Sequence, residues 1–145
     1  MTKHFDIEQV NDAIHDQYFE YDWIFHDIDK KEIVIAFKQL KYDEKEFVGS
    51  FLFVKKWKIP IYEARLIIEE VNDYEMINKG SELFDYFNIL RCRGTEDSEK
   101  IIEIVCNLGT VMNIRASGCC IRVEQGRKTA DYKKTTTFFM LESEG

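Results

Sequence analysis

The stretch KIIEIVCNLGTVMNIRA, residues 100–116, decides the class of fold that this chain adopts. Its apolar side chains alternate with other residues on both sides of a short centre: Ile102, Ile104, Cys106, Met112 and Ile114. Successive side chains of a β-strand point to opposite faces, so a period of two is typical of half-buried strands. The centre, Asn107-Leu108-Gly109, contains Asn and Gly, which tolerate the positive φ of a tight turn. The stretch therefore predicts an antiparallel hairpin.

Alternation of the same kind extends outward from this hairpin. Residues 17–28 and 32–40 form a further predicted hairpin. Its first strand places four aromatic residues on one face: Phe19, Tyr21, Trp23 and Phe25. Residues 46–57 predict one strand, which is apolar on both faces over 51–54 and is therefore expected to be central or covered. Further strands are expected at 61–71, 86–93 and 119–124, with 72–80 as a connection.

One helix and no linker complete the predicted organisation. Ile7, Val10 and Ile14 share one helical face, and Asp6 is a suitable N-cap. No segment of helix length separates successive strands, which disfavours a parallel α/β fold. We therefore expect a mainly β protein: an antiparallel sandwich or strongly curved sheet of about seven or eight strands with one short N-terminal helix. Residues 1–145 are expected to form a single domain, in which about 125–145 form a mobile tail or an added edge strand.

Composition excludes several classes of partner. The chain has 27 acidic and 20 basic residues, net −7, which disfavours nucleic acid because duplex binding needs a basic surface. Its longest apolar run has only five residues, 33–37, and the run 51–54 has four, against roughly 20 for a membrane span, so no membrane partner is expected. The first residues lack an apolar leader, which predicts a cytoplasmic protein. The four cysteines have no Cys-x-x-Cys spacing and are interpreted as small buried thiols in a reducing compartment: Cys92, Cys106, Cys119 and Cys120.

No catalytic or metal-binding motif stands out. The three histidines all fall within the first 26 residues, and neither a Gly-x-Ser-x-Gly elbow nor a phosphate-binding glycine loop occurs. His15-Asp16 and His26-Asp27 are the only pairs of metal-ligand type that attract notice. Because no third or fourth ligand follows at motif spacing, a structural role is favoured, with His15 holding the helix end and Asp16 accepting backbone N–H groups. We expect no catalytic residue, no cofactor and no metal.

Two parts of the sequence carry a resemblance. The first runs from Ile14-His15-Asp16 through Trp23 to Asp29 and on through 33–37, and the second comprises 107–109, 112–116 and 119–123. This pattern resembles small β-rich bacterial proteins, among them immunity proteins of polymorphic toxin systems and related domains of unknown function. The resemblance implies a stoichiometric toxin inhibitor without catalysis, and it brings no catalytic residue to this chain.

These observations favour a non-catalytic protein-binding module, in its specific form an immunity protein that neutralises a cognate toxin. Residues 1–50 carry net −6, and an acidic protein associates quickly with a basic partner. Alternation and turn position place four acids at one end of the first hairpin, where they form the candidate partner-binding site: Asp22, Asp27, Asp29 and Glu32. The competing interpretation of these acids is a solvated hairpin tip.

Other functions stay open beside this one. An antiparallel β-domain can enclose a ligand among aromatic side chains, and an enzymatic or small-molecule-binding domain is the alternative. The residues expected to line such a cavity are Trp23, Phe25, Phe37, Phe51 and Phe53. A homodimer formed through a sheet edge is a third possibility.

Overall fold

The structure is a computed structural model that describes residues 6–78, 82–94 and 98–138. Its elements in chain order are α1 (Ile7–Ile14), β1 (Tyr18–Glu20), the 3-10 turn η1 (Tyr21–Trp23), β2 (Ile24–Asp27), β3 (Glu32–Leu40), η2 (Tyr42–Glu44), β4 (Glu46–Phe51), β5 (Val54–Ile68), β6 (Val71–Ile77), β7 (Phe84–Gly94), β8 (Lys100–Cys106), β9 (Val111–Ala116) and β10 (Ile121–Phe138). The predicted mainly β fold with one short helix is confirmed, and the strands number ten in this part of the chain.

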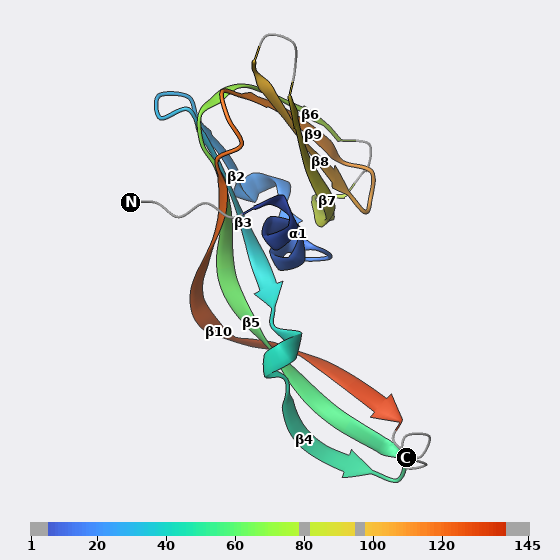
Figure 1. Cartoon of the computed structure of the whole chain (residues 1–145). Helices are drawn as coiled ribbons and strands as arrows, with labels where there is room; N and C mark the ends of the chain where they lie inside the picture. The colour runs from blue at the N-terminus through green and yellow to red at the C-terminus, as the bar shows by residue number, and fades with distance from the viewer. Residues whose placement is uncertain (1–5, 79–81, 95–97, 139–145) are drawn as a thin grey trace.

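All the strands join in one antiparallel sheet that bends strongly. The strand order is β10-β5-β3-β1-β7-β8-β9-β6, with β2 added beside β3 and β4 beside β5. The short strand β1 links the two halves, because it pairs with both β3 and β7. Figure 1 shows how the sheet curves so that β7, β8 and β9 face β3 and β5, with α1 lying in the hollow between them. The fold is therefore an open, curved sheet wrapped around one helix.

The core forms where the helix meets the concave face of the sheet. Asp6 caps α1 by accepting from the Gln9 backbone N–H at 2.8 Å, while the Gln9 side chain accepts from the Asp6 N–H at 3.3 Å. This capping box fixes the start of the helix, so that its fully buried Val10 and Ile14 face the sheet. The helix that the sequence predicts is thus present, with the predicted cap.

The hairpin predicted at residues 107–109 is also present. Gly109 has a φ of 103°, which a side chain would strain, and the strands β8 and β9 pair on either side of the turn. Asp85 of β7 lies fully buried beneath the turn and accepts from the backbone N–H groups of Leu108 at 2.8 Å and Thr110 at 3.2 Å. A carboxylate from another strand therefore anchors a turn that the sequence marks locally.

The first predicted strand, 17–28, is interrupted in the structure. The 3-10 turn η1 separates β1 from β2 and shifts the alternation of side chains between them. Phe19 is fully buried, Tyr21 and Trp23 are half-buried, and the Phe25 side chain is 61% exposed. The expectation that four aromatic residues share one buried face is therefore wrong, because a turn with three residues per revolution breaks a period of two.

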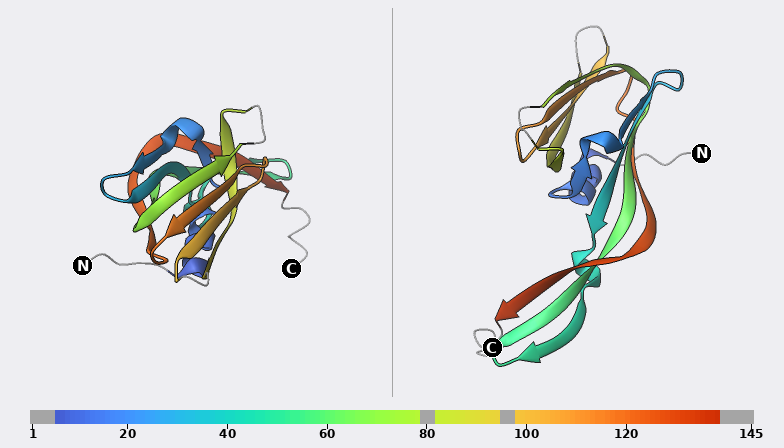
Figure 2. Two further views of the ribbon diagram at one scale, coloured as in Figure 1. Left: turned by 90° about the horizontal axis from the view of Figure 1, so that it is seen from above. Right: turned by 180° about the vertical axis from the view of Figure 1, so that it is seen from behind.

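The predicted covered strand at 46–57 is also wrong, because this segment turns back on itself. β4 and the first part of β5 pair as a hairpin whose last pair is Phe51 with Val54, which leaves Leu52 and Phe53 as the turn. The last part of β10 pairs with the other side of β5. Figures 1 and 2 show these three strands projecting from the rest of the molecule. We call residues 45–58 and 128–138 the arm, and the remainder the body.

Two segments expected to be irregular are strands instead. Residues 72–77, predicted as part of a connection, form β6 together with Val71 and pair with β9. Residues 125–138, for which a mobile tail and an added edge strand were both open, belong to β10 at one edge of the sheet. The rest of that predicted tail, 139–145, lies outside the described residues. The added strand β6 and the division of 17–28 into β1 and β2 explain why the sheet has more strands than expected.

The cysteines do not all behave as small buried thiols. Cys92 of β7 and Cys119, before β10, are disulfide-bonded, with their Cα atoms 6.6 Å apart. Cys106 is buried as a free thiol, and Cys120 is half-buried. The expectation therefore fits Cys106 and is wrong for the bonded pair, which a period-two pattern cannot bring together. None of the helices within the described ranges is long and apolar enough to cross a bilayer.

Candidate functional site

Three of the four predicted acids gather at the tip of the hairpin formed by β2 and β3. Asp27 ends β2 and pairs directly with Glu32, which begins β3, and Asp29 lies exposed in the turn between them. Asp22 is exposed too, but it belongs to η1 at the other end of β2. The structure therefore brings Asp27, Asp29 and Glu32 together and places Asp22 apart from them.

Basic residues moderate the charge of this tip. Lys30 and Lys31 occupy the same turn, and the Lys30 backbone N–H donates to Asp27 Oδ1 at 3.1 Å. Lys31 adopts a positive φ of 54°, and its carbonyl accepts from the Val71 N–H at 2.8 Å. These backbone hydrogen bonds give the turn a fixed shape, so its charges occupy defined positions.

The sequence alone missed two apolar side chains on the same hairpin. Phe25 is 61% exposed and Ile28 is 75% exposed, although His26 between them turns inward against the Tyr74 ring at 5.6 Å. We call this surface the acidic hairpin: Phe25, Asp27, Ile28, Asp29 and Glu32. The only sequence signal for its apolar part was Ile28, which stands between two aspartates in a turn. Apolar side chains within a charged rim are the usual arrangement at protein–protein interfaces.

A pocket of about 600 Å³ lies elsewhere on the sheet and bears on the alternative function. Of the five aromatic residues expected to line a cavity, Trp23 and Phe37 do so. Phe25 belongs to the acidic hairpin, and Phe51 and Phe53 are exposed on the arm. The polar residues of the pocket come from β3, β5 and β10: Lys38, Glu63, Arg65, Glu124 and Gln125.

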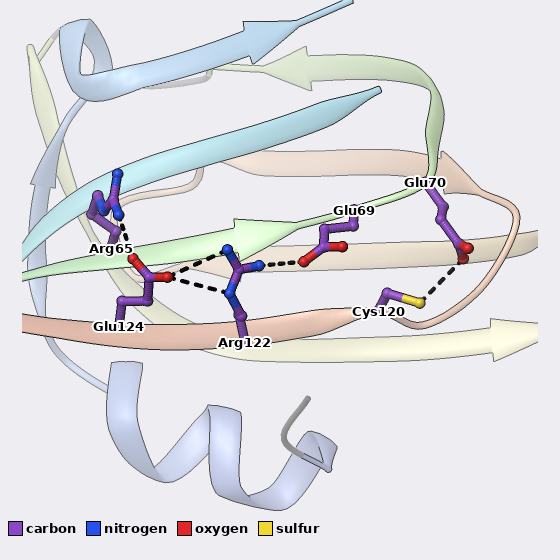
Figure 3. Close-up of polar contacts among 6 residues, drawn as sticks. All are labelled: Arg65, Glu69, Glu70, Cys120, Arg122 and Glu124. Atoms are coloured by element: carbon purple, nitrogen blue, oxygen red, sulfur yellow. Dashed lines mark hydrogen bonds and ion pairs between the residues drawn. The ribbon is translucent and has the colours of Figure 1, made fainter. Parts of the chain in front are cut away.

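The charged groups beside this pocket are committed to one another. Figure 3 shows Glu124 between two arginines, with Arg65 hydrogen-bonded to one oxygen and Arg122 at 3.3 Å from the other. Arg122 also forms an ion pair with Glu69, which follows β5. The hydrogen bond from Arg65 is the main cause that lowers the pKa of Glu124, against an opposing effect of burial. Glu124 is therefore ionised at neutral pH and has no proton to donate, so it is not suited to act as a general acid.

The free thiols are poorly suited to nucleophilic chemistry. Burial raises the pKa of Cys106 to about 12. The Cys120 thiol donates to Glu70 Oε2 at 3.1 Å, as Figure 3 shows, and this hydrogen bond raises the pKa of Cys120 to about 11. A thiol attacks as its thiolate, so both groups are in the unreactive form near neutral pH.

The His-Asp steps make anchoring contacts. His15 caps the C-terminus of α1, and its Nδ1 lies 2.9 Å from the Asn88 carbonyl oxygen of β7. Asp16 accepts from the Asn107 side-chain amide at 3.0 Å, whereas backbone N–H donors were expected. Within 6–78, 82–94 and 98–138, no group of three or more His, Cys, Asp or Glu is arranged to hold a metal ion.

Comparison of the chain with protein-family models, with curated proteins and with solved structures finds no match in any of the three.

Proposed function

We propose that this protein is a non-catalytic protein-binding module, and that its partner is a basic toxin which it neutralises as an immunity protein does. The observation that carries the proposal is the acidic hairpin, where Phe25 and Ile28 stand exposed among Asp27, Asp29 and Glu32. Two large apolar side chains on a rigid hairpin are suited to anchor a partner, because burying them removes apolar surface from water.

The acids give the module its preference for a basic partner. Charges on the rim of an interface act mainly on the rate of association, and salt screens their effect. The apolar anchors act mainly on the rate of dissociation, because they are buried only in the complex. Affinity and partner choice thus have separate sources on the same hairpin, and these sources can be tested separately.

The test compares two sets of charge-neutralised variants in capture experiments from the native host, followed by kinetics with the captured protein. The first set removes the predicted acids: Asp22→Asn, Asp27→Asn, Asp29→Asn and Glu32→Gln. The control set removes four exposed acids elsewhere: Glu8→Gln, Asp12→Asn, Asp73→Asn and Glu75→Gln. We expect the first set to slow association by roughly tenfold or more at low salt and to flatten its salt dependence. We expect the control set to leave both nearly unchanged.

Co-expression supplies the functional outcome. The wild-type protein and the control set should protect cells from the captured toxin, while Phe25→Ser with Ile28→Ser should not. Recovery of no protein partner would count against the proposal. Equal association rates for both charge-neutralised sets at low salt would remove the acids from the binding surface.

The pocket beside Trp23 supports the alternative of a small-molecule-binding domain. It combines the Trp23 ring with the Lys38 ammonium group, while Arg65 is paired with Glu124, and a flat ligand that carries an acidic group fits this arrangement. Titration with such a ligand, followed by the fluorescence of Trp23, discriminates between the two functions. Ala36→Phe is the control variant, because its larger side chain fills the pocket.

A further inference from the structure

The arm ends in exposed apolar side chains. Phe51, the last residue of β4, is 68% exposed, and Leu52 and Phe53, which form the turn to β5, are 72% and 52% exposed. Phe47 and Val48 of β4 are also more than half exposed. Figure 1 and the right panel of Figure 2 place this apex at the opposite end of the molecule from the β2–β3 hairpin. An apolar cluster at a projecting tip marks a contact surface, because water is a poor environment for it.

The arm is basic although the protein is acidic. It carries seven lysines against two acids, a net charge of +5. Because the whole chain has a net charge of −7, the remainder carries −12. Several of these lysines lie over aromatic rings: Lys45 lies 4.6 Å from the Trp57 centroid and Lys58 lies 4.0 Å from that of Tyr132. The arm therefore favours an anionic surface, and the body is repelled by one.

The apex of the arm, residues 51–53, lacks the residue types that usually form a hairpin turn. Leu52 adopts a positive φ of 55°, a conformation that two-residue hairpin turns ordinarily assign to Gly, Asn or Asp. A branched apolar residue at such a position is a local cost. Residues that break a local rule in this way often serve a function that compensates for the cost.

We propose that the arm docks on the surface of a bilayer that contains anionic lipids, with Phe51, Leu52 and Phe53 inserted among the lipids. Lys55 and Lys56 follow the apex by two to three residues, which is roughly 7–10 Å along a strand. This offset matches the depth of about 5–10 Å to which interfacial apolar groups are buried. The lysines then lie among the phosphates, where each contributes to binding.

The order of apolar and basic residues along the arm selects this occupant over others. A nucleic acid duplex presents phosphates at first contact, but the apex presents no hydrogen-bonding side chain there. A bilayer that contains anionic lipids offers charge at its surface and apolar volume directly beneath it, in the same order as the lysines and the apex of the arm. The sequence-based expectation of no membrane partner concerned a span, and the four-residue run 51–54 inserts without spanning.

The main variant replaces the apex by better turn chemistry. Only Leu52, the first residue of the two-residue turn, has a positive φ, and such turns favour Gly at that position. Leu52→Gly with Phe53→Asn supplies it, so the arm should fold at least as well as before. Binding is measured by co-sedimentation with vesicles of phosphatidylcholine containing about 30 mol % phosphatidylserine. We expect the wild-type protein to bind and this variant to bind more than tenfold more weakly, because two large side chains no longer leave water.

A second variant and two controls separate charge from apolar contact. Lys56→Glu with Lys134→Glu should weaken binding to the anionic vesicles by at least about tenfold and should remove its sensitivity to salt. Leu83→Asn removes a side chain of the body that is 79% exposed, and it should bind as the wild type does. The Phe25→Ser, Ile28→Ser variant should also keep vesicle binding, so failure of this inference and of the proposed protein-binding function are distinguishable.

Three results would overturn the inference. The first is equal binding of the wild-type protein to vesicles with and without phosphatidylserine, or to neither. The second is binding of a DNA or RNA duplex, without vesicle binding, that both arm variants abolish. The third is salt-sensitive self-association in sedimentation experiments, lost in both the arm and the acidic-hairpin variants, which would show that the arm binds the hairpin of a second copy.

Discussion

Asp85 shows how much one side chain contributes to this fold. Its carboxylate is fully buried and accepts three backbone N–H groups, those of Tyr86 at 2.7 Å, Leu108 at 2.8 Å and Thr110 at 3.2 Å. Beside it, the Tyr21 hydroxyl lies 2.5 Å from Thr110 Oγ1. The acid thus ties β7 to the turn between β8 and β9, and through that turn to η1.

Replacement of this acid by its amide should destabilise the protein strongly. Asp85→Asn keeps the size of the side chain, but its NH₂ group must face N–H donors where an oxygen stood. We expect a loss of about 3 kcal/mol in the free energy of unfolding, measured by urea denaturation. Asp43→Asn, at an exposed position of η2, is the matched control and should change stability by less than about 0.5 kcal/mol. Equal effects of the two substitutions would show that Asp85 is not an anchor.

At the scale of elements, local signals could be predicted and long-range ones could not. The turn at Asn107 and Gly109 follows from residue types that tolerate positive φ, and β3 follows from the spacing of Ile33, Ile35 and Phe37 on one face. The turn at Leu52 and Phe53 has no such marker, since apolar residues in a turn have the same pattern as a covered strand. Its position is set by pairing with β10, whose partner residues lie more than 70 positions away.

The residues of the candidate site also fall into those that could be predicted from the sequence and those that could not. Asp27, Asp29 and Glu32 are close in sequence, so a hairpin brings them together whatever the rest of the fold does. The exposure of Phe25 depends on η1, which no residue pattern in 17–28 marks. Its outward position therefore comes from packing against distant strands, and alternation alone assigns Phe25 to the wrong face.

The disulfide is the long-range feature with the most direct check. Cys92 and Cys119 connect β7 to the segment before β10 across 27 residues, whereas Cys106 and Cys120 are free thiols. Denatured protein should therefore bind two equivalents of an alkylating reagent without reductant and four after reduction, measured by mass spectrometry. Closing a loop of this size should stabilise the fold by about 3 kcal/mol, so Cys92→Ser with Cys119→Ser should lower stability by that amount. Four reactive thiols without reductant would exclude the bond.

At the scale of the whole molecule, charge and shape divide the protein into two ends. The arm carries +5 and an apolar apex, while the acidic hairpin projects from a body that carries −12. The proposed contacts lie at these opposite ends, so a molecule docked by its arm on an anionic surface leaves its hairpin directed away from that surface. The two binding events should not compete for residues.

The division into arm and body also predicts which part of the sheet unfolds locally most often. β5 is one continuous strand, but Ala64, Leu66 and Ile68 belong to the core cluster with α1, whereas 54–58 lie in the arm and contribute no residue to that cluster. Strands without an apolar core are marginally stable in water, and amide exchange reports such differences residue by residue. We expect backbone amides at 54–58 to exchange at least about a hundredfold faster than those at 64–68, measured by hydrogen–deuterium exchange. The step should fall near Ile59 and Pro60, which are the last buried residues before the arm. Uniform protection along β5 would mean that arm and body unfold as one unit, and the apolar apex would then be part of the stable fold.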